Sequence, residues 1–211
     1  MHKTIAEELH KIEPERPFPI FSVYNDLAFQ VVAKSLFSGG VSETQVKRLQ
    51  HITEEAQKML VRELRQPYLG WWFRVSGTLK KHLNLTLEAR DILKKLVNNR
   101  KQSGVRENDL LDMLLDARYE DGNAMDEEQL IDEILILFTA GHETTSNALT
   151  FTTQLLAKHP EYQEQVFQEI QQAKKETKDL MELLRHVPVT TNVVEESLRL
   201  YPPAYFIDRV N

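Results

Sequence analysis

The segment DEEQLIDEILILFTAGHETTSNALTFTTQLLAKH, residues 126–159, decides the fold. At about 1.5 Å per residue a helix of this length is roughly 50 Å long, and Pro160 marks its end. Asp126 is a typical N-cap, and Gln129 is placed to return the hydrogen bond in a capping box. The middle of the segment, residues 134–138, is apolar on every side, which is typical of a helix surrounded by protein. We therefore expect a central helix that crosses the domain.

The rest of the chain divides into further helical segments. All eight prolines and six of the seven glycines fall between stretches whose apolar residues recur every three or four positions. The sequence therefore predicts a mainly α fold with little β structure, with one strand within residues 204–210. An aromatic bend is expected at residues 66–77, with Trp71 and Trp72 as a packing anchor. The expected helices cover about residues 3–12, 22–37, 43–65, 86–102, 107–118, 126–158, 160–176, 179–186 and 190–200.

The composition excludes several classes of function. Twenty-six Lys and Arg against thirty-two Asp and Glu give a formal net charge of -6, so nucleic acid is not an expected partner. The chain has no cysteine, which excludes disulfides, a thiolate zinc site and a cysteine nucleophile. The most apolar run, residues 134–140, is too short and too closely flanked by charges to span a membrane. We expect a soluble chain and a cytoplasmic location, with an anchor on an upstream segment left open.

Gly141 is the one glycine that lies inside a predicted helix. Glycine in a helix interior costs about 1 kcal/mol relative to alanine, and the stiff side chains of Thr144 and Thr145 add to the local cost. Weak helix formers gathered at mid-helix predict a bent or widened turn, of the kind found where a ligand approaches backbone. The alternative is a helix that accepts a small residue for close packing against a neighbour. The sequence leaves both interpretations open.

A zinc site is a further interpretation of the same turn, because His142 and Glu143 begin the zinc-protease helix signature. The second histidine ligand should follow four residues after the first, so that both imidazoles share one face of the helix. That position is occupied by Ser146. The sequence therefore predicts no metal site in this chain.

A second cluster lies near the C-terminus. Glu196 and Arg199 stand at positions i and i+3 of a predicted helix, and Leu-Tyr-Pro-Pro follows at residues 200–203. Such a pair on its own contributes only about 0.2 to 0.5 kcal/mol and is common on helix surfaces. Its significance comes from its combination with the mid-helix motif.

Taken together, the two clusters resemble the haem-thiolate monooxygenases of the cytochrome P450 family. An Ala-Gly-x-Glu-Thr-Thr motif in a long helix is followed about fifty residues later by Glu-x-x-Arg. The resemblance is sharpest over residues 110–209. It implies an enzyme that inserts one atom of dioxygen into a hydrophobic organic substrate, with haem as cofactor. It also implies an electron-donating partner, either a reductase or a ferredoxin or flavodoxin.

The resemblance also implies roles for individual residues. Ala140 and Gly141 correspond to the groove in which dioxygen binds next to the haem iron. Glu143 and Thr144 correspond to the acid and the alcohol that deliver protons there. A hydroxyl suits this role because it donates and accepts at once, and a carboxylate can exchange protons with solvent.

Other residues correspond to structural and binding positions. Glu196 and Arg199 resemble an ion pair that ties their helix to the segment preceding the haem ligand, and Arg209 matches an arginine that contacts a haem propionate. The helical period and the following turn give a set of expected substrate contacts, each with core packing as an equal alternative. These are Ile134, Leu137, Phe138, Thr145, Ala204, Tyr205 and Phe206.

The chain departs from the family at the haem ligand, because the family binds iron through a cysteine thiolate. We therefore interpret residues 1–211 as a single partial domain, the middle portion of a cytochrome P450 domain, with the N-terminal part and the cysteine loop outside it. The intact protein is expected to bind haem, and this chain alone is expected to be inactive. The alternative is a non-enzymatic helical scaffold or interaction domain in which the AGHETTS turn is a packing kink.

Overall fold

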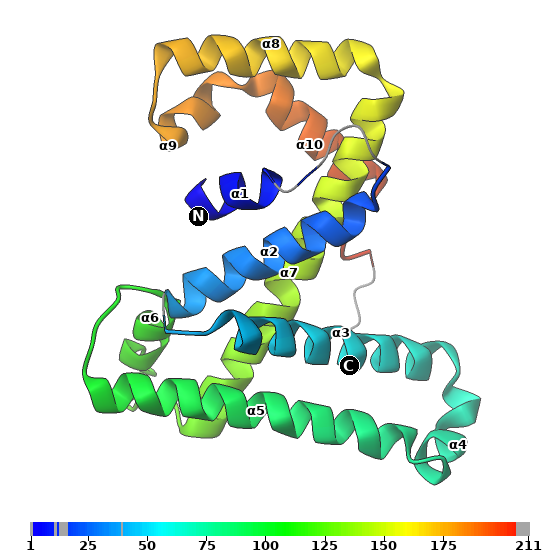
Figure 1. Cartoon of the computed structure of the whole chain (residues 1–211), viewed down its shortest axis with the longest axis vertical. Coiled ribbons are helices and arrows are strands. Elements are labelled where there is room, and N and C mark those ends of the chain that lie inside the picture. Colours follow the sequence, from blue (N-terminus) through cyan, green and yellow to red (C-terminus); the bar gives the residue numbers. More distant parts are fainter. Residues whose placement is uncertain (1, 11, 13–16, 39, 206–211) are drawn as a thin grey trace. The chain divides into compact units, whose positions relative to one another are not determined.

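The computed structural model describes residues 2–10, 12, 17–38 and 40–205. These residues form helices joined by short connections (Figure 1), and their one β feature is an isolated bridge between Arg118 and Ala124. The prediction of a mainly α fold is confirmed. Of the strand expected within residues 204–210, residues 206–210 lie outside the described part, and residues 204 and 205 are not in a strand.

The helices follow the predicted order, with differences at the aromatic bend. The bend contains a short 3₁₀ turn and a helix of its own, α4, because Gly77 adopts a left-handed conformation with φ of 72° and lets the next helix begin at once. α5 therefore begins at Thr78 instead of about residue 86. The α-helices are α1 (His2–Leu9), α2 (Ile20–Phe37), α3 (Glu43–Arg65), α4 (Gly70–Val75), α5 (Thr78–Ser103), α6 (Leu110–Asp116), α7 (Glu127–Lys158), α8 (Pro160–Glu176), α9 (Leu180–Leu183) and α10 (Pro188–Leu200).

The prediction that Trp71 and Trp72 anchor the aromatic bend by packing is wrong. Trp71 and Trp72 are 63% and 49% exposed and contact each other edge to face, with ring centroids 5.8 Å apart. The buried residue of α4 is Phe73, because a helix of six residues can turn only one of three consecutive aromatic side chains fully inward.

Of the two hydrogen bonds of the capping box predicted at the N-terminus of α7, the structure forms one. The backbone N–H of Gln129 donates to Asp126 Oδ1 over 2.7 Å, which confirms Asp126 as the cap. The Gln129 side chain does not return the bond but donates to Glu133 Oε1 over 2.6 Å. The Gln129 side chain is therefore bonded to Glu133, one turn later in the helix, instead of completing the capping box.

The contacts divide the chain into two compact units. Unit 1 comprises residues 1–10 and 29–141, and unit 2 comprises residues 11–28 and 142–211. The divisions fall inside α2 and inside α7, and each unit is described by itself. The single partial domain expected from the sequence stays a prediction.

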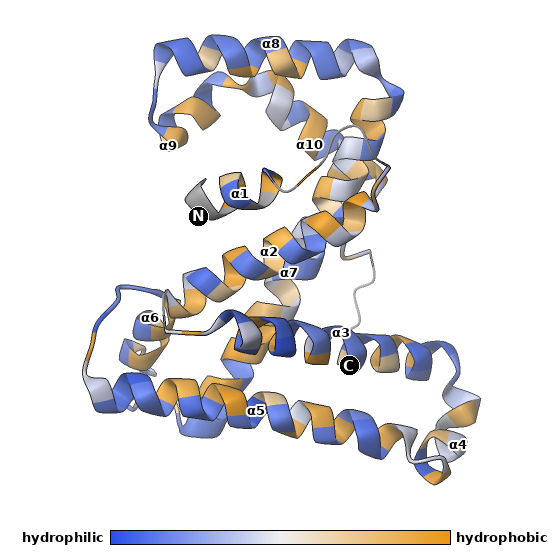
Figure 2. Ribbon diagram, in the orientation of Figure 1, coloured by the Kyte–Doolittle hydropathy of each residue, from blue (hydrophilic) through white to orange (hydrophobic). Residues whose placement is uncertain are grey.

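Unit 1 has an aromatic and aliphatic core. Phe138 of α7 stacks on Phe29 of α2, with ring centroids 5.1 Å apart, and lies 6.0 Å from the ring of Phe37. α3 and α5 pack against each other and alternate hydrophobic and hydrophilic residues along their length (Figure 2), as expected for helices with one buried face. Leu49 of α3 and Leu93 of α5 belong to the same buried cluster as the three rings.

A buried ion cluster fixes the connection between α5 and α6 in unit 1. The Arg100 guanidinium donates to Asp109 Oδ2 over 2.8 Å and to Asp112 Oδ1 over 2.9 Å, and all three side chains are almost fully buried. Asp112 also accepts the backbone N–H groups of Glu107 and Asn108, at 2.7 and 2.9 Å. The cluster therefore satisfies backbone donors as well as neutralising charge.

This cluster predicts an acid-sensitive step in stability. Burial alone would raise the pKa of Asp112, but hydrogen bonds from Arg100 and from the two backbone N–H groups outweigh it and hold the pKa below its ordinary value. A carboxyl with a lowered native pKa stabilises the fold above its unfolded pKa, about 3.9, and loses that contribution as the pH falls through the native pKa. We expect the melting temperature to fall more steeply below about pH 4 in the unmodified chain than in Asp112→Asn.

Circular dichroism melts between pH 7 and pH 3 measure this difference. Asp91→Asn, at an exposed position of α5, serves as the control and should keep the acid dependence of the unmodified chain. An Asp112→Asn variant with an unchanged acid limb would contradict the prediction.

Unit 2 is joined by polar and aromatic contacts among its helices. Glu169 of α8 accepts the backbone N–H groups of Val189 and Thr190 at the start of α10, each over 2.8 Å, and so caps that helix from outside. Phe151 of α7 stacks on Tyr201, with ring centroids 4.5 Å apart and planes 5° from parallel. These contacts connect α8 to the first turn of α10, and α7 to the residue that follows α10.

Among the described residues, no helix combines the length and the apolar character that crossing a lipid bilayer requires.

Candidate functional site

The AGHETTS turn, residues 140–146, lies inside α7 as predicted, but the helix is not widened there. α7 is an uninterrupted α-helix from Glu127 to Lys158. The Ser146 hydroxyl donates to the Glu143 carbonyl over 3.0 Å, and the Thr150 hydroxyl donates to the Ser146 carbonyl over 2.7 Å. Both hydroxyls bond to carbonyls three or four residues earlier in the same helix, and the helix keeps its α form there. The expectation of a widened turn is therefore wrong, and the expectation of a bent turn stays a prediction.

Gly141 is explained by packing within unit 1. A Cβ atom built on this glycine would lie 3.0 Å from Val32 Cγ2 on α2, closer than side chains normally approach. The missing side chain at residue 141 therefore leaves room for this close packing of α7 against Val32. The packing alternative that the sequence left open thus accounts for the glycine, and Ala140, its neighbour, is exposed.

The polar part of the turn has an exposed side and a buried side. Glu143 and Thr144 are exposed, and they follow Ala140 by three and four positions, so the three share one face of α7. His142 and Ser146 are fully buried. The turn therefore presents a methyl group, a carboxylate and a hydroxyl together, which is an arrangement that can accept, hold and pass on protons.

The expected substrate contacts on α7 separate into two groups. Ile134 and Phe138 lie in the core of unit 1, as the packing alternative expects, and their contact with a substrate stays a prediction. Leu137 is partly buried against that core, and Thr145 is exposed. The helical period placed these residues near one face, but the neighbouring helices decide which of them are covered.

The C-terminal cluster is formed as a surface ion pair. Arg199 Nε and Nη2 donate to the two carboxylate oxygens of Glu196, each over 2.7 Å, and the guanidinium lowers the pKa of Glu196. Both side chains are exposed in unit 2. Of the remaining expected site residues, Ala204 is exposed and Tyr205 is 81% exposed. Phe206 and Arg209 lie outside the described residues.

Sequence reasoning missed two features that the structure brings together. The first is Glu169, which caps α10 from another helix. Glu169 precedes the residues that it binds by about twenty positions, so no local capping motif marks it. A cationic cavity between α3 and α5 combines residues from two helices and has no linear motif.

This chain supplies the α7 side of a haem site, and the exposed residues of the turn are compatible with a flat cofactor there. Ala140 presents only a methyl group and Thr144 a hydroxyl, so neither blocks a planar group that lies against this face of α7. None of the 211 residues is a cysteine, so a thiolate ligand is not among them.

Comparisons with known proteins agree on one family. The sequence model of that family, described as cytochrome P450, matches residues 2–211. The chain is 30% identical over 200 residues to cyclooctat-9-en-7-ol 5-monooxygenase of Streptomyces melanosporofaciens, covering 94% of this chain and 43% of that protein. It is 34% identical over 188 residues to taxane 10-beta-hydroxylase of Taxus cuspidata, covering 84% of this chain and 36% of that protein.

A solved structure gives the same result. The chain superposes on a retinoic acid-bound cyanobacterial CYP120A1 with a TM-score of 0.76 and 25% sequence identity, covering 94% of this chain and 43% of that one. The chain thus spans less than half the length of the relatives that it matches.

Proposed function

The chain belongs to the cytochrome P450 family, and from that membership we propose that the protein it forms part of is a haem-thiolate monooxygenase. The proposed reaction inserts one atom of dioxygen into a hydrophobic organic substrate. The observation that carries the proposal is the family match across residues 2–211. The exposed residues Ala140, Glu143 and Thr144 of α7 support it, because they belong to the Ala-Gly-x-Glu-Thr-Thr motif that resembles the family's.

Haem, when bound, supplies the activation of dioxygen, and the cysteine thiolate comes from outside these residues. The Thr144 hydroxyl holds a proton at its oxygen and accepts another hydrogen bond at the same time. Glu143 is exposed and exchanges protons with solvent, so it replenishes the hydroxyl of the next residue. Ala140 keeps this face of the helix clear, and the backbone at Gly141 forms the rest of the dioxygen groove.

The remaining roles follow the family pattern. Glu196 and Arg199 would form the structural pair that ties α10 to the segment before the thiolate, and Arg209 would hold a haem propionate. The substrate lies against Leu137 and Thr145, and against the turn that contains the residues Ala204, Tyr205 and Phe206.

The proposed substrate is a hydrophobic small molecule. The two relatives are named cyclooctat-9-en-7-ol 5-monooxygenase and taxane 10-beta-hydroxylase. Both names denote the oxidation of an organic molecule. Electrons reach the haem from a reductase or from a ferredoxin or flavodoxin. A non-enzymatic scaffold is the competing function, because close packing against Val32 explains Gly141 without any chemistry.

The test is the spectrum of the reduced haem protein with carbon monoxide. The whole protein is expected to give the strongly red-shifted Soret band of thiolate ligation. The 211-residue chain, reconstituted with haem, is expected to lack that band because it contains no cysteine. A whole protein without the band would favour the scaffold, and a band from this chain alone would overturn the assignment of the ligand.

A further inference from the structure

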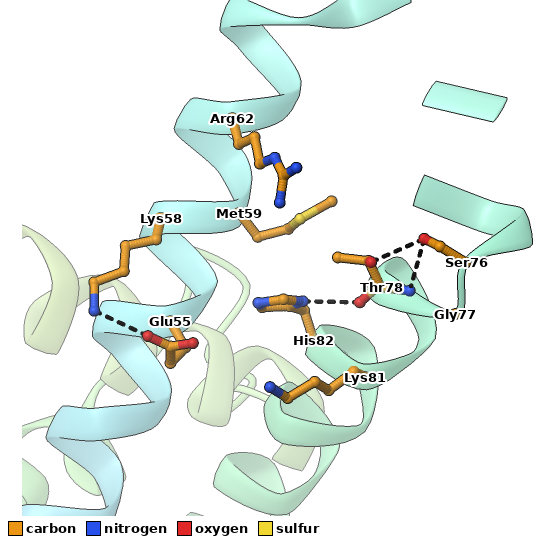
Figure 3. A pocket seen from close by; sticks show the side chains of 9 residues that line it. All are labelled: Glu55, Lys58, Met59, Arg62, Ser76, Gly77, Thr78, Lys81 and His82. Carbon is orange, nitrogen blue, oxygen red and sulfur yellow. Dashed lines mark hydrogen bonds and ion pairs between the residues drawn. The ribbon is translucent and has the colours of Figure 1, made fainter. Parts of the chain in front are cut away.

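A cavity of about 420 Å³ opens between α3 and the start of α5 in unit 1 (Figure 3). This volume is in the range of pockets that bind small molecules. α3, the connection between α4 and α5, and the first turns of α5 supply its walls, and none of its residues belongs to the AGHETTS turn. The side chains that matter for its chemistry are Glu55, Lys58, Arg62, Ser76, Lys81 and His82.

The lining is cationic in a chain whose formal net charge is -6. Lys58, Arg62 and Lys81 face one carboxylate, Glu55, which leaves a formal charge of +2. Glu55 already accepts from Lys58 Nζ over 2.9 Å. Within the described part of the chain, the side chains of Arg62 and Lys81 have no carboxylate partner. Arg62 and Lys81 can therefore bind an external anion.

Arg62 is held in position without losing its hydrogen-bond donors. Its guanidinium carbon lies 5.0 Å from the centroid of the Phe73 ring, and Phe73 is buried. A guanidinium over an aromatic face is stabilised by cation–π attraction, which leaves the N–H groups at its edge available. Figure 3 shows this guanidinium directed toward the space above Met59.

Two hydroxyls and an imidazole complete the opposite wall. The hydroxyls of Ser76 and Thr78 lie 2.9 Å apart, so one of them donates to the other and the pair retains a free donor. His82 donates from Nδ1 to the Thr78 carbonyl over 2.8 Å, because a carbonyl can only accept. Its other ring nitrogen points away from Thr78, toward the side of the cavity where Glu55 lies (Figure 3).

The geometry points to a binding site for a phosphomonoester dianion in this cavity. A charge of -2 balances the lining, whereas a single carboxylate group would leave one cation unpaired. The tetrahedral oxygens match donors that approach from two helices and from the hydroxyl pair. The first turn of α5 carries no acidic residue, so its helix dipole adds to the same potential. The cavity leaves room for the organic part of an ester, so a phosphate ester is expected to bind more tightly than inorganic phosphate.

Titration of the full chain with ribose 5-phosphate, followed by ³¹P NMR and calorimetry, tests this site. The double variant Arg62→Gln with Lys81→Gln is expected to weaken binding at least tenfold. The matched control is Arg65→Gln with Lys80→Gln, exposed neighbours on the same two helices that do not line the cavity. It is expected to change the Kd less than twofold. Lys81→Gln alone, at an exposed position, gives a second readout if the double variant does not fold.

Titrations with inorganic phosphate alone and with ribose alone show which part of ribose 5-phosphate the site binds. Weaker binding of inorganic phosphate and none of ribose supports an ester site, and equal binding of phosphate and ester assigns the same site to free phosphate. Absence of binding at millimolar ester overturns the inference. Equal weakening by the control variant also overturns it, since diffuse surface charge would then explain the binding, and so does acetate binding as tightly as phosphate.

Discussion

Replacing Thr144 by alanine in the whole protein is expected to lower the product formed per dioxygen consumed by about tenfold or more. The missing oxygen should be recovered as hydrogen peroxide, in which two electrons and two protons have reduced dioxygen without reaching the substrate. The physical reason is that alanine removes the exposed hydroxyl that the proposed mechanism places next to Glu143 in proton delivery. Dioxygen uptake, peroxide and product measured in one reaction give the ratio directly.

Two variants separate proton delivery from structure. Thr144→Ser keeps a hydroxyl and should restore most of the coupling. Thr150→Ala removes a hydroxyl from the same helix whose bond, 2.7 Å long, goes to the Ser146 carbonyl, and it should leave coupling unchanged. If Thr144→Ala and Thr150→Ala behave alike, the proposed role of Thr144 is wrong and the packing interpretation of the turn gains support.

The substitution Phe138→Ala is expected to lower the free energy of unfolding by about 3 to 5 kcal/mol. Phe138 is 1% exposed and contacts the rings of Phe29 and Phe37, so alanine leaves a cavity that α2 and α7 cannot close without moving. Urea denaturation followed by circular dichroism measures the change, as a lower midpoint at an unchanged slope.

The same substitution at an exposed position is the control. Phe167 of α8 is 53% exposed, and Phe167→Ala should change stability by about 0.5 kcal/mol or less. A Phe138→Ala variant as stable as Phe167→Ala would contradict the assignment of Phe138 to the core. A raised KM of the whole protein for its substrate in Phe138→Ala would support the predicted substrate contact.

Helix positions followed from local signals in the sequence. α3 and α8 begin and end at the predicted residues, 43–65 and 160–176, and α7 differs by one residue at its start. Ser42 caps α3 through its side chain, and Pro160 starts α8, so both signals act within a few residues of the helix end. The early start of α5 was missed because it depends on the left-handed conformation of Gly77, which the residue type permits but does not dictate.

Burial could not be predicted in the same way. The aromatic run at residues 71–73 predicts a packed bend, but only contacts with α3 and α5 select Phe73 over Trp71 and Trp72. Sequence analysis identified Gly141 as anomalous, whereas its reason, a neighbouring side chain 3.0 Å away, belongs to another helix.

The sequence by itself therefore determined the helical class, most helix boundaries and the family, because caps, breakers and motif spacing act between residues close along the chain. The tertiary structure decided which residues of one helix face are core and which are exposed, separating Ile134 and Phe138 from Thr144. It also assembled the cationic cavity from α3 and α5. These outcomes depend on which helix packs against which, and the area that such packing removes from water is not encoded in any local stretch.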